Sequence, residues 1–150
     1  MSSELDEIAS ELQKQMWAGY SETVIDHAQN PRNVGAIYDA DGFASVTGPC
    51  GDTMGIWLKV RDGIVRQATF RTDGCGATVS AGSMVTELAK GKTVSEAYRI
   101  TQQDVLDALG GLPEESVHCA LLAANTLKAA IRDYLDTRNE PWKRAYRRVV

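Results

Sequence analysis

Apolar residues in the first part of the chain recur at helical spacing. The residues of this first stripe are Leu5, Ile8, Leu12 and Met16. They predict an amphipathic helix over residues 3–17, which either docks or forms a mobile arm. Ser21 is a good N-cap for a second helix, which should end before Pro31 because the residue preceding a proline avoids helical geometry.

The pattern then changes from helical spacing to alternation. Residues 54–60 alternate between large apolar and other side chains, which predicts a half-buried strand. Asp62-Gly63 is a strong hairpin signal. Residues 65–72 should return as the next strand, and residues 43–47 supply an earlier one. We therefore expect a meander of three antiparallel strands.

After residue 76 the pattern is helical again. Ala77 to Lys90 should form a helix that Gly91 ends. Capping boxes are expected at Thr93 and, more weakly, at Thr101, and a long helix should follow with Ser116 as its N-cap. The predicted fold class is α+β: a three-stranded antiparallel sheet packed against several helices.

Composition narrows the class of protein. The chain has 150 residues, 43% hydrophobic and 24% charged, with a formal net charge of −4. This suits one globular domain and disfavours nucleic-acid binding, which needs a basic surface. No apolar run is long enough for a membrane span. The acidic first residues do not resemble a signal or transit peptide, so we expect a cytoplasmic protein.

The chain has three cysteines, an odd number that suggests free thiols in a reducing compartment. Cys50 precedes one predicted strand and Cys75 follows the next, so an antiparallel hairpin should bring their loops together. Cys119 lies near the start of the long helix. Glycines on both sides of Cys75 should leave its thiol uncovered and allow unusual φ values, and the helix start should favour thiolate. Three thiols at the ends of elements predict one shared site.

Two further donors accompany these thiols, Asp52 and His118. Thiolate and imidazole select zinc or iron–sulfur chemistry. There is no close cysteine pair of the kind that builds a structural zinc knuckle, so the site should be open and labile. Other interpretations stay open: Asp52 could cap its own turn, and a cysteine hydrolase would need only one of the thiols. His27 has no cysteine neighbour and is interpreted as structural.

The sequence resembles a known family, the U-type iron–sulfur cluster assembly scaffolds, which comprise IscU and the N-terminal domain of NifU. The resemblance covers residues 20–135. The matching stretches are Tyr20–His27, Asn30–Gly35, Cys50-Gly51-Asp52, Gly74-Cys75-Gly76, His118-Cys119 and Lys128–Ile131. The ordered set of CGD, GCG and HC is specific, although each alone would be weak.

The resemblance implies a scaffold or carrier rather than an enzyme. Cys50, Cys75 and Cys119 would bind a [2Fe-2S] cluster, while Asp52 and His118 complete the site or exchange there. Fe²⁺ would enter at this group, and Zn²⁺ can occupy the same ligands. Cys119 would accept sulfur as a persulfide from a cysteine desulfurase, and Asp52 would make the cluster labile. A ferredoxin-type electron donor and acceptor apoproteins are the other implied partners, and a homodimer stays open.

The resemblance divides the chain into an N-terminal helical extension (1–19), a scaffold domain (20–137) and a basic C-terminal tail (138–150). The family's Leu-Pro-Pro-Val-Lys segment, which a specialised Hsp70 reads, is replaced here by Leu112–Ser116 with two acids. We therefore expect an Hsp70-type chaperone to be disfavoured. The alternative function is a zinc-binding sulfur acceptor like SufU, but that branch has an insertion between its second and third cysteines and lacks the histidine matching His118.

Overall fold

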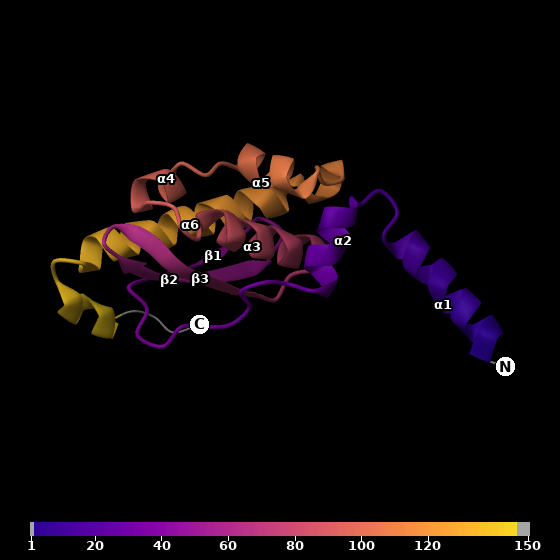
Figure 1. The fold of residues 1–150 in the computed structure, drawn as a ribbon, viewed down its shortest axis with the longest axis horizontal. Helices are drawn as coiled ribbons and strands as arrows, with labels where there is room; N and C mark the ends of the chain where they lie inside the picture. The colour runs from indigo at the N-terminus through magenta and orange to yellow at the C-terminus, as the bar shows by residue number, and fades with distance from the viewer. Residues whose placement is uncertain (1, 147–150) are drawn as a thin grey trace.

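The computed structural model describes residues 2–146 of the chain. Its elements are α1 (Ser2–Met16), α2 (Glu22–Gln29), β1 (Gly42–Thr47), β2 (Thr53–Arg61), β3 (Ile64–Thr72), α3 (Gly76–Ala89), α4 (Val94–Tyr98), α5 (Gln102–Leu109), the 3₁₀ turn η1 (Glu114–Ser116), α6 (Val117–Thr137) and the 3₁₀ helix η2 (Pro141–Tyr146). The predicted α+β class is confirmed, with the strands first and most helices after them (Figure 1).

The sheet is the predicted antiparallel meander, in the order β1-β2-β3. Asp62 and Gly63 form the tight turn between β2 and β3, and both have positive φ, 55° and 73°, as a type I′ turn requires. Thr53, at the start of β2, pairs with the end of β1, and the neighbouring Met54 pairs with Thr72 at the end of β3. The β1–β2 loop and the segment after β3 therefore lie at the same end of the sheet.

β2 is more buried than the alternating pattern predicts. Ile56 is fully buried, and Trp57, which points to the opposite face, is only 9% exposed. The Phe43 ring lies 4.9 Å from the Trp57 ring, and the Arg71 guanidinium lies over the same indole at 5.9 Å. The expected half-buried strand is thus wrong for the centre of β2, because aromatic side chains of neighbouring strands cover its second face.

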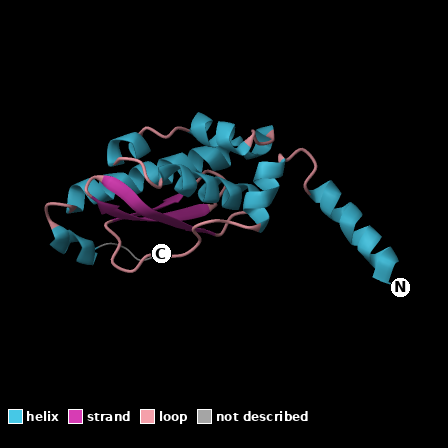
Figure 2. Ribbon diagram, in the orientation of Figure 1, coloured by secondary structure: helices cyan, strands magenta, loops and turns pink. Residues whose placement is uncertain are grey.

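Helices α3 and α6 pack against the sheet and cover one side of it (Figure 2). Glycines allow this close approach at two points. A Cβ on Gly82 of α3 would lie 2.4 Å from the Phe70 ring, and one on Gly42 of β1 would lie 2.6 Å from the carbonyl oxygen of Ala130 in α6. The close packing of α3 and α6 on the sheet therefore depends on the absence of a side chain at these two positions.

The predicted N-terminal helix is confirmed as α1, which extends away from the rest of the fold (Figure 1). Its apolar stripe of Leu5, Ile8, Leu12 and Met16 is 57–64% exposed. Within residues 2–146, no helix is long and apolar enough to cross a membrane. The proposed boundaries of the extension, scaffold domain and tail stay predictions.

Most predicted helix caps are present, with one exception. The Ser21 hydroxyl accepts from the Val24 amide, and capping boxes begin at Thr93 and Thr101. Ser116 does precede α6, but its side chain caps nothing. It ends the preceding 3₁₀ turn with ψ near 0°, and its hydroxyl lies 3.5 Å from the Tyr20 hydroxyl.

The predicted basic tail is only partly described by the structure. Lys143 pairs with two acidic side chains, Asp136 at 3.6 Å and Glu140. The arginines at 147 and 148 lie outside the described residues. In the described part of the tail, the charge of Lys143 in η2 is therefore neutralised by carboxylates at the end of α6 and just after it.

His27 is a structural histidine, as predicted. It is 8% exposed, and its Nδ1 lies 2.7 Å from the Ser83 hydroxyl on α3. Burial lowers the pKa of His27, and the Arg32 charge lowers it further, while Asp26 and Glu87 oppose the shift. Protonation of the imidazole is therefore less favourable in the folded protein than in the unfolded chain.

This predicts a loss of stability in mild acid. The unfolded chain binds a proton at His27 below about pH 6.5, whereas the folded chain resists it. The stabilisation is therefore complete above that value and is lost as the pH falls through the lowered pKa. We expect the free energy of unfolding, measured by urea titration with chelator present, to fall less between pH 7.5 and 5 in His27→Asn than in the wild type. Equal slopes in the two proteins would contradict the assignment.

Candidate metal centre

Three segments distant in sequence supply the candidate site. Cys50 lies in the β1–β2 loop, Cys75 is the N-cap residue of α3, and Cys119 lies in the first turn of α6. Two hydrogen bonds tie the first two segments together at the end of the sheet. The Thr53 amide donates to the Asp73 carboxylate at 2.9 Å, and the Thr72 hydroxyl donates to the Thr53 carbonyl at 2.6 Å.

The Thr78 hydroxyl is the centre of the contacts among the candidate residues. It donates a 2.9 Å hydrogen bond to the carboxylate of Asp52. The same oxygen lies 3.4 Å from the Cys119 sulfur and 3.9 Å from the Cys75 sulfur. Thr78 is fully buried and lies in the first turn of α3. Sequence reasoning missed it because a threonine near a helix start carries no metal-site signal.

The two thiols that contact Thr78 differ in their environment. Cys75 is exposed, and although its partial burial raises its pKa, the backbone amides of Thr78 and Ala77 outweigh this and lower it. The lowered pKa of Cys75 agrees with the expectation that the helix start favours its thiolate. Cys119 is 2% exposed, and burial raises its pKa, with repulsion from Cys75, Asp52 and Cys50 adding to the effect.

Burial distinguishes Cys119 from the other two thiols. Cys50 and Cys75 are exposed, but Cys119 belongs to the hydrophobic core. The Nε2 of His118 lies 3.8 Å from its sulfur. Repulsion from Cys50 is the weakest of the effects that raise the pKa of Cys119. Asp52 bonds across the site to Thr78, so the reading of Asp52 as a cap of its own turn is wrong.

The two glycines around Cys75 have a different role from the predicted one. Neither has positive φ. A Cβ on Gly74 would lie 2.6–2.7 Å from three atoms of the Thr78 side chain, and one on Gly76 would lie 2.9 Å from the Trp17 ring. The glycines are therefore required for close packing: one makes room for Thr78 and the other for an indole from the segment after α1.

The candidate residues have the donor types that hold an iron–sulfur cluster or zinc, namely three sulfurs, a carboxylate and an imidazole. As they stand, however, no three Cys, His, Asp or Glu side chains within residues 2–146 are arranged to hold one metal ion. The types of donor atom suit a bound cluster or zinc ion. In this structure, however, the Thr78 hydroxyl contacts two of the donors, Asp52 and Cys119. Loading a metal therefore requires these side chains to turn.

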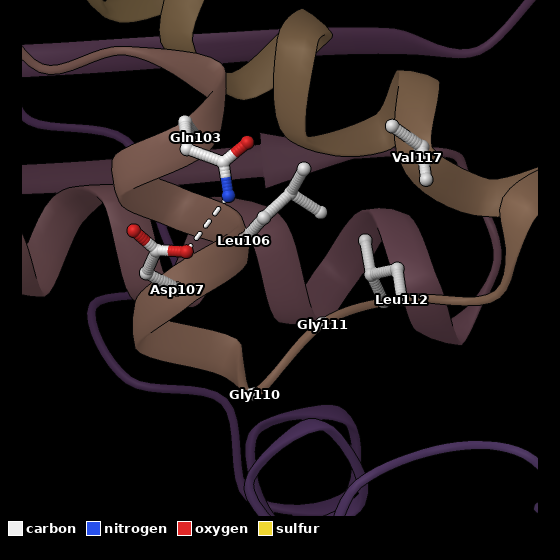
Figure 3. Close-up of a pocket in the computed structure, with 7 residues that line it drawn as sticks. All are labelled: Gln103, Leu106, Asp107, Gly110, Gly111, Leu112 and Val117. Atoms are coloured by element: carbon white, nitrogen blue, oxygen red, sulfur yellow. Dashed lines mark hydrogen bonds between the residues drawn. The ribbon is translucent and has the colours of Figure 1, made fainter.

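A pocket of the structure lies elsewhere, between the end of α5 and the start of α6 (Figure 3). Leu106, Leu112 and Val117 line it, and the Gln103 amide donates to the Asp107 carboxylate at its edge, at 2.7 Å. It contains no cysteine or histidine. The candidate ligand residues therefore lie at the end of the sheet, outside this pocket.

Comparison with known families decides what kind of protein has this arrangement. The model of the "NifU-like N terminal domain" matches residues 19–141. The chain belongs to the NifU-like N-terminal domain family. The resemblance found from the CGD, GCG and HC motifs is therefore confirmed, and the matched region contains every candidate residue of the site.

Relatives of this NifU-like chain are named as iron–sulfur cluster assembly scaffold proteins. It is 53% identical over 116 residues to "Iron-sulfur cluster assembly scaffold protein IscU 1" of Archaeoglobus fulgidus, covering 77% of this chain and 76% of that protein. It is 46% identical over 124 residues to the IscU scaffold protein of Escherichia coli K12, covering 79% and 96%. The corresponding protein of Aquifex aeolicus is 43% identical over 119 residues, with 77% and 76% covered.

Solved structures of low sequence identity share the fold. The N-terminal NifU-like protein of Brucella abortus aligns with a TM-score of 0.64 at 21% identity, covering 81% of this chain and 97% of that one. A putative scaffold protein for the SUF system from Fervidobacterium islandicum also aligns at 0.64 and 21%, with 77% and 98% covered. These likenesses confirm the three-stranded α+β architecture of the NifU-like domain.

The addition of one methyl group at Gly74 tests its packing against Thr78. Gly74→Ala would force the Thr78 side chain aside, so we expect a loss of about 1–3 kcal/mol in the free energy of unfolding. Gly48→Ala is the matched control, because its Cβ would meet the Leu122 side chain at an ordinary 3.7 Å. Chemical denaturation measures both; a Gly74→Ala protein as stable as Gly48→Ala would refute the packing role.

Proposed function

We propose that this protein is a scaffold on which a [2Fe-2S] cluster is assembled and from which it passes to acceptor apoproteins, so that the cluster is cargo and the protein is not an enzyme. The IscU relatives carry this scaffold role in their names. The observation that carries the proposal is the set of three thiols, one carboxylate and one imidazole, drawn from three segments at one end of the sheet.

The division of roles follows from the surroundings of each donor. Cys50, Cys75 and Cys119 bind the cluster through sulfur, and Asp52 or His118 supplies the remaining position. A carboxylate is a hard ligand among soft sulfurs, which makes the bound cargo easier to lose. Fe²⁺ enters at the same group, and Zn²⁺ competes for it. A site without a rigid cysteine pair suits a protein that must give its cluster away.

Sulfur delivery requires a movement of the chain. We assign the persulfide to Cys119, which a cysteine desulfurase loads. Because this thiol is 2% exposed, the first turn of α6 has to open before a partner can reach it. A ferredoxin-type donor supplies the electrons that convert persulfide sulfur to sulfide. A cytoplasmic location and a disfavoured Hsp70 partner, because Glu114 and Glu115 are exposed, stay predictions.

Anaerobic reconstitution tests the proposed function against the zinc-binding, SufU-like alternative. The metal-free protein is given iron, sulfide and zinc, and the product is assayed for metals, acid-labile sulfide and visible absorption. We expect iron and sulfide in equal amounts with the absorption of a [2Fe-2S] cluster. Cys50→Ser, Cys75→Ser and Cys119→Ser should each lose most of the cluster. Stoichiometric zinc without sulfide would favour the sulfur acceptor and end the scaffold proposal.

The role of Asp52 predicts a change in how fast the cluster is lost. Asp52→Ala removes the hard ligand, so the cluster should leave more slowly than from the wild type. The rate is followed by the decay of visible absorption after a chelator is added. Asp73→Ala is the control, since its carboxylate bonds a backbone amide at the same end of the sheet. Equal or faster loss from Asp52→Ala would count against this role.

A further inference from the structure

The Thr78 hydroxyl connects two candidate ligands that the proposed function treats as independent. It lies 2.9 Å from the Asp52 carboxylate and 3.4 Å from the Cys119 sulfur. Thr78 is 0% exposed, so no bulk water is available to replace its hydrogen bond. Within residues 2–146, this bond is the only hydrogen bond of the Asp52 side chain.

A hydroxyl has one proton to donate. The Thr78 hydroxyl donates it to the Asp52 carboxylate, although the sulfurs of Cys119 and Cys75 also lie 3.4 and 3.9 Å from the same oxygen. The carboxylate is therefore held by a buried group, and it has to give up this hydrogen bond before it can turn to bind a metal ion.

We propose that Thr78 is a positioning residue that couples Asp52 to α3: its hydroxyl holds the Asp52 carboxylate and so restrains it from binding a metal ion. This inference rests on the proposed function and adds a residue to its site. Thr78 is not itself a ligand. It determines how easily the Asp52 carboxylate becomes available as one.

The packing around Thr78 supports a fixed position for its hydroxyl. Thr78 sits on α3, three residues after Cys75, and its side chain fills the space that the missing Cβ of Gly74 leaves. β-branching further restricts its rotation about χ1. The restraint on Asp52 is therefore built into α3, while Asp52 itself lies in the loop segment before β2.

The test is a double-mutant cycle on zinc affinity, measured by competition with a chromophoric chelator. Thr78→Val keeps the shape and removes the hydroxyl, so Asp52 is free to bind from the start. Zinc accepts a carboxylate as a ligand, and the wild-type Asp52 must first give up its hydrogen bond to Thr78, so we expect zinc to bind about tenfold more tightly to Thr78→Val. Thr78→Ser keeps the hydroxyl and should match the wild type. In an Asp52→Ala background, Thr78→Val should have no effect, because there is no carboxylate to release.

Two controls separate coupling from a general effect on folding. Thr126→Val removes an equally buried hydroxyl that bonds only the α6 backbone, at the Leu122 carbonyl, and it should leave zinc affinity unchanged. Co²⁺ spectra report the ligands directly: Thr78→Val should shift the d–d bands, and Asp52→Ala should remove that shift. If Thr78→Val does not fold, Thr78→Ala removes the same hydroxyl with less bulk.

The inference is overturned if Thr78→Val binds zinc no more tightly than the wild type, or if its gain persists without Asp52. Neither readout needs a cluster to be built. A protein that assembles no [2Fe-2S] but shows the coupling would refute the proposed function and keep this inference. A protein that assembles the cluster normally but lacks the coupling would refute this inference and keep the proposed function.

Discussion

Antiparallel pairing of β2 with both of its neighbours is the constraint on which the site depends. The register that opposes Thr47 with Thr53 also opposes Met54 with Thr72. The loop with Cys50 and the segment with Cys75 therefore emerge side by side. A shift of one residue would turn every β2 side chain to the other face and would take Ile56 out of the core under the helices. Burial of the sheet thus also fixes where the sulfurs lie.

Helix packing adds the third sulfur to the first two. α3 and α6 pack on the sheet and on each other, which places Cys119 against Thr78. The price is burial of Cys119, which raises its pKa, while the amides at the start of α3 lower that of Cys75. Two thiols of one site therefore differ in reactivity because one lies at a helix start and the other in the core.

The sequence was sufficient for the helices and strands because they depend on local signals. Alternation, the Asp62-Gly63 turn and the threonine capping boxes each determine structure within a few residues. The sequence was not sufficient where distant residues meet. Nothing local predicts that Phe43 covers Trp57, or that the glycines beside Cys75 make room for Thr78 and Trp17. These are consequences of packing, and they also explain why Thr78 was missed.

The central claim is that sulfurs from three segments converge on one metal, which requires a rearrangement of the side chains around Thr78. X-ray absorption of the zinc-loaded protein tests it most directly, because the number of sulfur atoms around zinc is counted at ~2.3 Å. The account predicts three sulfurs and one nitrogen or oxygen, with one sulfur lost in each single Cys→Ser variant. Two sulfurs or fewer, or a count that does not change when Cys119 is replaced, would contradict it.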